Sequence, residues 1–229
     1  MSNDFQITEG VILRAIPFRD HDHILSLFTR DVGLMKILYR GSRTSKGSKK
    51  CVCTPLSKVE VIYQEKRGEI FSCREMHSLD LFPDLRKNLH FLEVGCDLLH
   101  VISAAQMPGK ASPSLYDLLL FYLKKIPFAA YPWVLSASFR MKMLLHEGVT
   151  SFPLACMECG LCLVEEAFFC GNEIRCVQHR QMGSTILTAA ELRLLAELAL
   201  CKNFQEIASI QLSAVQYIRI KCLYESVKT

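Results

Sequence analysis

The sequence lacks the short motifs that mark the commonest catalytic sites. It has no P-loop, no GxGxxG, no GxSxG and no HExxH, so nothing indicates phosphate transfer, dinucleotide binding, acyl transfer or zinc-dependent proteolysis. The zinc-deaminase pattern of His-x-Glu with Pro-Cys-x-x-Cys is also missing, because His146 and Glu147 are adjacent and Ala155 precedes Cys156. We therefore expect a protein that is not an enzyme.

The sequence also lacks long apolar runs. A membrane-spanning helix needs about 18 to 20 apolar residues in succession, whereas the longest run, residues 126–135, is broken by Pro127 and Pro132. The first residues, MSNDFQITEG, carry acids where a signal peptide carries a basic start. We expect no membrane association and a reducing, cytoplasmic environment in which the 11 cysteines are not needed as disulfides.

Repeats and a large excess of charge are absent as well. The longest low-complexity tract is the Ser, Lys and Gly stretch at residues 41–50, which argues against solenoids and coiled coils. Lys and Arg number 27 against 23 Asp and Glu, and the resulting net charge of +4 does not by itself indicate a nucleic-acid partner. Half of the residues are hydrophobic and 22% are charged, so the chain can bury a substantial core in one large domain or two small ones.

The apolar pattern changes character near residue 80. Before that point, turns rich in charged residues and glycine separate five short strand-like runs, which cover residues 10–16, 23–29, 34–39, 56–63 and 69–74. Five short strands with tight connections predict a small barrel, and a five-stranded oligonucleotide-binding (OB) barrel is one of several architectures that fit. We therefore predict a barrel domain over residues 1–80.

After Pro83 the apolar spacing becomes helical, with apolar residues recurring at intervals of three and four. Helices are expected over residues 85–102, 114–125 and 133–146, with one or two more over 203–226. Ser114 is a plausible N-cap, and Thr188 with Glu191 forms a capping-box pattern that opens a further helix. The expected fold class is α+β, with a mostly helical domain over residues 81–229.

Positive charge is concentrated between Val32 and Val59, a segment with seven basic residues and no acid. The basic residues are Lys36, Arg40, Arg43, Lys46, Lys49, Lys50 and Lys58. Serine, threonine and glycine fill the middle, so hydroxyls, backbone N–H groups and cations can meet phosphate oxygens without reading bases. The alternative is a solvated loop whose lysines keep the protein soluble.

Three aromatic residues near this segment are candidates for stacking on bases: Tyr39, Tyr63 and Phe71. Aromatic residues at strand spacing more often belong to a hydrophobic core. The pattern leaves both interpretations open for all three residues.

A cysteine cluster indicates a metal site. Cys156-Met-Glu-Cys159 is followed, after sixteen residues, by Cys176-Val-Gln-His179, and two ligand pairs with two-residue spacers at this separation are typical of tetrahedral zinc. Gly160 permits the tight turn that such a knuckle uses. Four protein ligands leave no open position for water, so we expect a structural zinc ion rather than a catalytic one.

Other ligand sets and a metal-free interpretation stay open. Cys162 could take the place of Cys156, because Cys159-Gly-Leu-Cys162 has the same spacer, and Cys170 could replace His179. We prefer the set with two matched knuckles, Cys156, Cys159, Cys176 and His179, which leaves Phe168 and Phe169 free to pack beneath the loop. Free cysteines also pack well as small buried hydrophobic residues.

Several of these residues, taken in order, resemble the RecO family of bacterial recombination-mediator and DNA repair proteins. In the first half these are residues 9–13, 20–24, 27–29, Gly33 and the basic stretch that starts at Arg40. In the second half they are residues 139–145 together with Gly148, Pro153, Cys156, Cys159 and Gly160. Two features depart from the family pattern, because the fourth metal ligand is commonly Cys where this chain has His179, and the basic stretch matches in charge rather than residue by residue.

The resemblance implies an N-terminal OB barrel and a C-terminal helical domain with an inserted zinc motif, here at about residues 152–182. It also implies binding of single- and double-stranded DNA, annealing of complementary strands, and loading of RecA onto DNA covered by single-strand-binding protein, together with RecR. A nucleoid-associated location in the cytoplasm follows from these partners. The residues expected to hold the DNA backbone are Arg40, Arg43, Lys46, Lys49 and Lys50.

The acidic, apolar-ended tail of single-strand-binding protein would suit a groove on the helical domain with nearby cations. Candidates for those cations are Arg140, Lys142, Arg193 and Lys202, although such charges often belong to a solvated helix face. A competing interpretation is a zinc-ribbon interaction or transcription-regulatory protein that has no annealing activity.

Overall fold

A computed structural model describes residues 5–19, 22–40, 53–65 and 68–227. The chain forms two compact units, Met1–Pro127 and Phe128–Thr229, which we describe separately. The change from strands to helices occurs near residue 80, whereas the compact units divide at residue 127 because the first two long helices group with the strands. Among the described helices, none has the length and apolar character needed to cross a bilayer.

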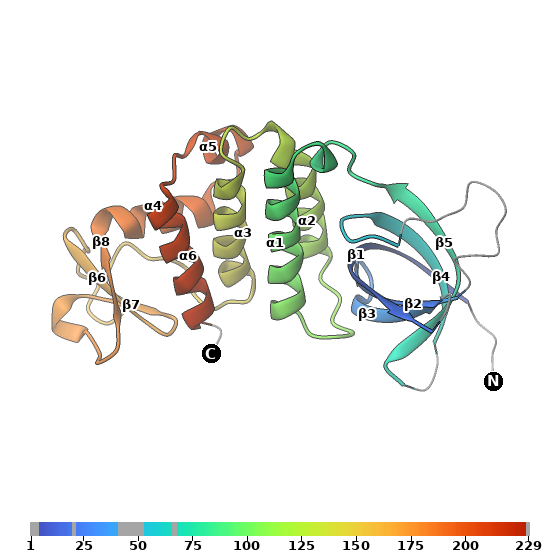
Figure 1. The fold of residues 1–229 in the computed structure, drawn as a ribbon. Helices are drawn as coiled ribbons and strands as arrows, with labels where there is room; N and C mark the ends of the chain where they lie inside the picture. Colours follow the sequence, from blue (N-terminus) through green and yellow to red (C-terminus); the bar gives the residue numbers. More distant parts are fainter. Residues whose placement is uncertain (1–4, 20–21, 41–52, 66–67, 228–229) are drawn as a thin grey trace. The chain divides into compact units, whose positions relative to one another are not determined.

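The first unit contains a closed barrel of five strands (Figure 1). These are β1 (Gln6–Phe18), β2 (Asp22–Thr29), β3 (Gly33–Tyr39), β4 (Lys58–Gln64) and β5 (Ile70–Asp80). Their order around the barrel is β1-β2-β3-β5-β4, and every pairing is antiparallel except the parallel pairing of β3 with β5. The predicted five-stranded barrel is confirmed. Because the barrel is closed, each of its strands pairs with a neighbour on both sides.

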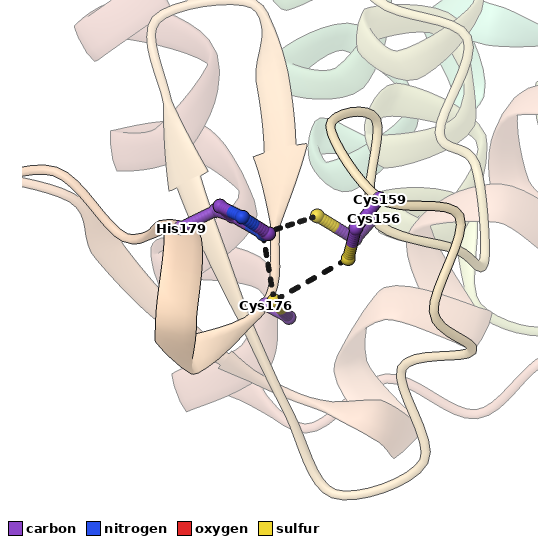
Figure 2. Close-up of side chains that lie close together, drawn as sticks. All are labelled: Cys156, Cys159, Cys176 and His179. Carbon is purple, nitrogen blue, oxygen red and sulfur yellow. Dashed lines mark hydrogen bonds between the residues drawn. The ribbon is translucent and has the colours of Figure 1, made fainter.

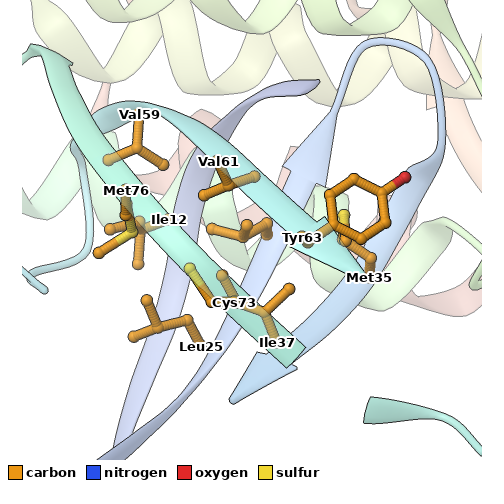
Figure 3. Packing of buried hydrophobic residues seen from close by; sticks show 10 residues of the cluster. Ile12, Leu25, Met35, Ile37, Val59, Val61, Tyr63, Cys73 and Met76 are labelled. Atoms are coloured by element: carbon orange, nitrogen blue, oxygen red, sulfur yellow. The ribbon is translucent and has the colours of Figure 1, made fainter. Parts of the chain in front are cut away.

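Side chains that alternate along each strand fill the barrel interior (Figure 3). The buried cluster consists of Ile12, Leu25, Leu27, Met35, Ile37, Val59, Val61, Tyr63, Cys73 and Met76. The Tyr63 hydroxyl donates to Gln6 Oε1 at 2.6 Å, so the one phenol in this cluster keeps a hydrogen bond near the barrel end. Burial of this set holds the strands in a register that leaves the alternate residues facing outward.

Two long helices complete the first unit: α1 (Leu89–Ala105), after the single 3-10 turn Leu85–Lys87, and α2 (Pro113–Lys125). The first helix starts later than its apolar spacing suggests, because the Asn88 side chain accepts a hydrogen bond from the His90 N–H at 2.8 Å and caps the helix there. The N-cap of α2 is Ser112 rather than Ser114, since Pro113 occupies the first turn, a position that needs no N–H partner.

The connection between α1 and α2 lies against the barrel at β3. The Gly109 N–H donates to the Leu34 carbonyl at 3.0 Å, and Leu34 also pairs with Pro108. Gly33, with φ of +77°, lies so near the Lys110 carbonyl that a Cβ at residue 33 would be 2.0 Å from that oxygen. Both the backbone angle and this close approach require glycine.

The entry into β4 is held by a single guanidinium. Arg86 donates from Nε to the Leu81 carbonyl at 2.8 Å, and from one terminal nitrogen to the Pro55 carbonyl at 3.0 Å and the Leu56 carbonyl at 2.9 Å. Leu56 itself is buried, although its φ of +59° is unfavourable for a residue with a Cβ. Arg86 therefore fixes the chain where the basic segment ends.

The second unit packs helices around α3 (Pro132–His146), which contacts α4 (Ala189–Leu200), α5 (Phe204–Ser209) and α6 (Ala214–Val227). The expected capping box at the start of α4 is confirmed, with Thr188 and Glu191 satisfying each other's backbone N–H groups. A three-stranded antiparallel sheet of order β7-β6-β8 adjoins α4, formed by β6 (Glu166–Cys170), β7 (Glu173–Arg175) and β8 (Thr185–Thr188). The sequence analysis did not predict these short strands.

Two of the four cations proposed for a protein-binding groove on this unit are structural instead. Arg140 is fully buried on α3, where it donates to the Ser136 hydroxyl and its guanidinium carbon lies 5.7 Å from the Tyr224 ring centre. Lys142 donates to the Ala199 carbonyl at 3.0 Å and to the Cys201 carbonyl, at the C-terminal end of α4, where a cation is favoured. The remaining two, Arg193 and Lys202, are exposed.

Candidate metal centre and nucleic-acid interface

Four side chains from two loops converge in the second unit (Figure 2). The ligand atoms of Cys156, Cys159, Cys176 and His179 all lie within 4.8 Å of one another. Cys156 Sγ is 3.7 Å from His179 Nδ1, Cys176 Sγ is 3.3 Å from the same nitrogen, and Cys159 Sγ is 3.9 Å from Cys176 Sγ. Residues twenty positions apart therefore form one compact group of three thiols and an imidazole.

The spacing of these atoms fits one tetrahedral ion. Zn–S bonds of about 2.3 Å and Zn–N bonds of about 2.0–2.1 Å place the ligand atoms of a tetrahedral ion about 3.5–3.8 Å apart. Three of the six separations in the cluster are 3.3 to 3.9 Å, close to this range, and all six are within 4.8 Å. The cluster can hold a metal ion, and three sulfurs with one imidazole nitrogen are the donor set that zinc prefers.

Backbone turns on both loops aim the ligands inward. In the first loop the Gly160 N–H donates to the Cys156 carbonyl at 2.9 Å, and Gly160 has a φ of +73°, as a tight knuckle requires. In the second loop Cys176 precedes a short 3-10 turn, and the His179 N–H donates to the Cys176 carbonyl at 3.1 Å. Each two-residue spacer is thus closed by one turn, which brings its two ligands to the same side.

The knuckle N–H groups also favour thiolates. Burial acts to raise the pKa of the Cys156 thiol, but N–H groups of Cys159, Cys176 and Glu158 donate to its sulfur and lower that pKa to about 6. The pKa of Cys176 is lowered too, because N–H donors that include His179 outweigh the opposing effect of burial. Since a metal binds the thiolate and not the thiol, this environment favours metal binding at Cys156 and Cys176. The Leu161 N–H acts to lower the pKa of Cys159, but desolvation and the sulfurs of Cys156 and Cys176 outweigh it, so that pKa is raised instead.

The two alternative cysteine ligands lie outside this group. Cys162 is exposed and pairs through its backbone with Ala155. The Cys170 thiol donates to Gln181 Oε1 at 2.9 Å, at the end of β6. Neither residue belongs to the group of mutually close ligand atoms.

The sheet and an ion pair support the two loops from outside the ligand group. Phe168 and Phe169 on β6 are both buried. Arg175, next to Cys176, lies 3.3 Å from Glu158 in the first loop and also pairs with Glu173 on β7. The loops are therefore joined by an ionic link as well as by the ligand group.

Of the five residues predicted to hold a phosphate backbone, the structure describes one. Arg40 is exposed and follows directly on the end of β3. Arg43, Lys46, Lys49 and Lys50 lie outside the described residues. The geometry thus places the start of the basic segment at one end of the barrel.

The outward side of the barrel near this end carries both cations and apolar side chains. Two cross-strand rows define an outer strand face: Arg14, Ser26, Lys36 and Ile70 in one row, and Ile16, Ile24, Leu38 and Ser72 in the next. Ile16 and Ile70 are each 39% exposed and add apolar surface to this face. Sequence reasoning missed this face because β1 continues beyond the predicted Ile16, to Phe18, and its alternation became visible only from the register.

The three aromatic candidates for base stacking differ in position. Tyr63 is only 1% exposed and belongs to the barrel core, which rules it out as a surface stacking platform. Phe71 is half-buried on β5, with its ring centre 5.7 Å from that of Tyr63 in a stacked arrangement. Tyr39 is half-buried at the end of β3.

Comparison with known proteins gives matches in both halves of the chain. The family profile described as "Recombination protein O N terminal" matches residues 1–82, and that described as "Recombination protein O C terminal" matches residues 94–221. These ranges take in the barrel, the long helices and the metal-ligand cluster.

Three similar proteins carry the name DNA repair protein RecO. The one from Chlamydia pneumoniae is 23% identical over 201 residues, 88% of this chain and 79% of the relative. Those from Exiguobacterium sibiricum and Alkaliphilus metalliredigens are 24% and 23% identical and cover 80% and 90% of this chain, with 74% and 85% of their own lengths matched. With both family profiles matched and the five-stranded barrel in place, the chain belongs to the RecO family of DNA repair proteins.

Proposed function

We propose that this protein is a DNA-binding recombination mediator. It binds single- and double-stranded DNA, anneals complementary strands, and helps to load RecA onto DNA coated by single-strand-binding protein, together with RecR. The observation that carries the proposal is the outer strand face, where Arg14 and Lys36 flank apolar side chains on a barrel of the oligonucleotide-binding type. β3, which carries part of this face, ends at Tyr39, and the basic residues from Arg40 to Lys50 follow directly after it.

In this proposal phosphates and bases are held by different groups. The cations of the basic segment bind the DNA backbone: Arg40, Arg43, Lys46, Lys49 and Lys50. The outer strand face accepts unpaired bases, since its apolar side chains give a surface for base planes. Annealing needs no catalytic residue, because screening of two phosphate backbones lowers their repulsion and base pairing supplies the free energy.

The metal ion in this proposal is a structural zinc held by Cys156, Cys159, Cys176 and His179. Bound there, it would cross-link the two loops beside the three-stranded sheet. Four protein ligands fill a tetrahedral shell, so no position remains for a reacting water. The ion would stabilise the second unit and take no part in contacts with DNA bases.

In this proposal the acidic tail of single-strand-binding protein binds to exposed cations on the second unit. Arg193 on α4 and Lys202 just after it are the two exposed residues of the four considered. Arg140 and Lys142 are excluded from that role, because both are engaged within the helical packing.

A charge-reversal experiment tests the DNA-binding role. Replacing Arg43, Lys46 and Lys49 with Glu should weaken binding to all DNA sequences alike, and should reduce the slope of log affinity against log salt by about 0.7 per lost contact with single strands. A matched control reverses three exposed lysines that are not on the barrel strands, Lys87, Lys124 and Lys221. The measurement is fluorescence anisotropy over a salt series, followed by strand annealing with and without single-strand-binding protein.

Two results would decide against this proposal. Equal DNA affinities for the charge-reversed variant and the wild type would remove the basic segment from the interface. A wild-type protein that retains metal but anneals no strands would favour an interaction or regulatory protein without mediator activity.

A further inference from the structure

A pocket of about 480 Å³ lies on the first unit, between β3 and the connection after α1. Its wall is apolar, formed by Leu13, Val32, Leu34, Met35, Phe71 and Pro108; Met35 belongs to the barrel core and Phe71 packs against that core. Polar groups stand around this wall: Ser26 and Lys36 from the strands, Glu69 just before β5, and Ser103 from α1. An apolar hollow of this size with a few polar groups has the character of a small-molecule site and not of a packing defect.

The pocket is built by backbone contacts that hold its two sides together. The Gly109 N–H bonds the Leu34 carbonyl at 3.0 Å, and the approach of the Lys110 carbonyl to Gly33 leaves no room for a side chain. These contacts join the connection to the first residues of β3. The hollow is therefore formed before a ligand binds, and binding does not lose conformational entropy in ordering its walls.

Phe71 connects the pocket with a second hollow. One face of its ring stacks on Tyr63 in the core, at 5.7 Å between ring centres. Phe71 also lines a smaller hollow of about 200 Å³, together with Phe18, Ile24, Leu38, Ile70 and Ser72. The two hollows thus share Phe71 as a lining residue, next to the short β3–β5 pairing.

Positive charge lies next to the first hollow. Lys36 lies on β3 and Arg40 is the first residue after its end, so the Cα atoms of these two cations are at most about 14 Å apart. Arg14 stands in the same cross-strand row as Lys36. A ligand that fits this arrangement carries repeated negative charges at intervals and flat apolar groups between them, which describes a single-stranded nucleic acid.

We propose that the pocket receives an unpaired base of a DNA single strand whose backbone follows Lys36 and Arg40. The inference rests on the proposed DNA-binding function and adds a structural basis for preferring single strands. In a duplex the bases are stacked and paired inside, so only the phosphates can reach the barrel face. In a single strand a base can rotate into the hollow beside Phe71.

Blocking the pocket from its α1 side tests this assignment. Ser103 lines the pocket and is exposed, and the next residue, Ala104, is exposed but does not line it. Ser103→Phe should fill the hollow, and Ala104→Phe is the matched control with an added ring on the same helix. Both positions are on the helix surface, so the fold should tolerate either change.

Each full-length protein is titrated with two oligonucleotides of equal length, one with normal bases and one with abasic sites on an intact backbone. The wild type and Ala104→Phe should bind the normal strand about 5- to 150-fold more tightly than the abasic strand, the range expected for one stacked base. Ser103→Phe should lose most of this preference, bind the abasic strand like the wild type, and keep its duplex affinity.

The outcomes separate the pocket from the function on which it rests. If wild type and Ser103→Phe show the same preference for normal over abasic strands, the pocket does not hold a base, even though salt-dependent DNA binding persists. That result would also be expected if the pocket took the apolar end of a peptide instead. If the wild type binds neither oligonucleotide, the proposed function and the pocket assignment both fail.

Discussion

Arg86 shows how much one exposed side chain can do at the residue scale. Its guanidinium bonds three carbonyl oxygens, those of Pro55, Leu56 and Leu81, at 2.8–3.0 Å. We expect Arg86→Met to lower the free energy of unfolding by about 1–2 kcal/mol, because carbonyls in the entry to β4 lose a charged donor. Urea denaturation followed by circular dichroism measures this.

The neighbouring Lys87 supplies the control for that prediction. It is exposed and forms a surface ion pair of 2.6 Å with Asp84. Lys87→Met should change the stability by less than about 0.5 kcal/mol, as surface pairs usually do. Equal losses for both variants would show that Arg86 has no special role.

Glu69 is an acid beside Lys36, one of the cations that the DNA backbone follows in our proposal. Its carboxylate lies 3.6 Å from Lys36 Nζ and is 87% exposed. If the outer strand face binds phosphates, Glu69→Gln should raise the affinity for DNA by about two- to fivefold at low salt, because one repulsive charge and a competing partner of Lys36 are removed. Fluorescence anisotropy titrations at low and high salt measure the gain in DNA affinity and its loss when salt screens the charges.

A second acid, on β5 itself, separates a local effect from a change in total charge. Glu75→Gln removes one negative charge from β5, at an exposed position that pairs with Arg74 and His77. Its DNA affinity should stay near that of the wild type. An equal gain from both variants would indicate that only the net charge matters.

At the scale of elements, the two cysteine loops behave as one unit if they share an ion. Cys159→Ser should release the metal and destabilise the second unit, while Cys162→Ser, outside the ligand group, should retain it. Metal content by atomic absorption and thermal unfolding of both variants test this. Loss of metal from Cys162→Ser but not from Cys159→Ser would contradict the assigned ligand set.

The same loops should release metal in acid. The pKa of Cys156 is depressed to about 6, so its thiolate persists as the pH falls towards 6 and is protonated below it. A depressed pKa stabilises the deprotonated, metal-binding form above that value, and the benefit is lost below it. Because protons and the ion compete for the same sulfur, metal retention after dialysis should fall only once the pH is below about 6, and loss of the metal already at pH 7 would contradict the depressed pKa.

The elements differ in how far the sequence alone defines them. The five barrel strands and the helix after Thr188 were predictable, because alternation and capping are local signals. The end of β5 was not, because the strand runs six residues beyond the predicted Arg74, and five of these pair with β4 across register shifts near Ile62 and Lys58. The β6–β8 sheet was missed since its strands are only three to five residues long and lie among turn residues.

The candidate sites show the same division between local and distant information. The spacing of Cys156, Cys159, Cys176 and His179 identified a group that the structure brings together. By contrast, the outer strand face depends on cross-strand neighbours such as Arg14 and Lys36, which are 22 positions apart. Burial of Arg140 was also unpredictable, because nothing in its own helix distinguishes it from an exposed cation.

At the scale of the whole molecule, the two compact units should respond separately to loss of metal. Treatment with a strong chelator should increase amide hydrogen exchange in β6, β7 and β8, because the ligand loops adjoin that sheet, and leave β1 to β5 protected. Exchange detected by mass spectrometry, with and without chelator, resolves the two regions. A uniform rise across both units would show that the ion stabilises the chain as a whole.

The closure of the barrel has a consequence for synthesis of the chain. β3 ends at Tyr39, and its partner in the barrel, β5, begins only at Ile70. At about 5–20 residues per second, the ribosome needs about 2–6 seconds to add the 31 residues from 39 to 70. During that interval β3 has an unpaired edge, and we expect this to be the period in which the nascent protein most needs protection against strand pairing with other chains.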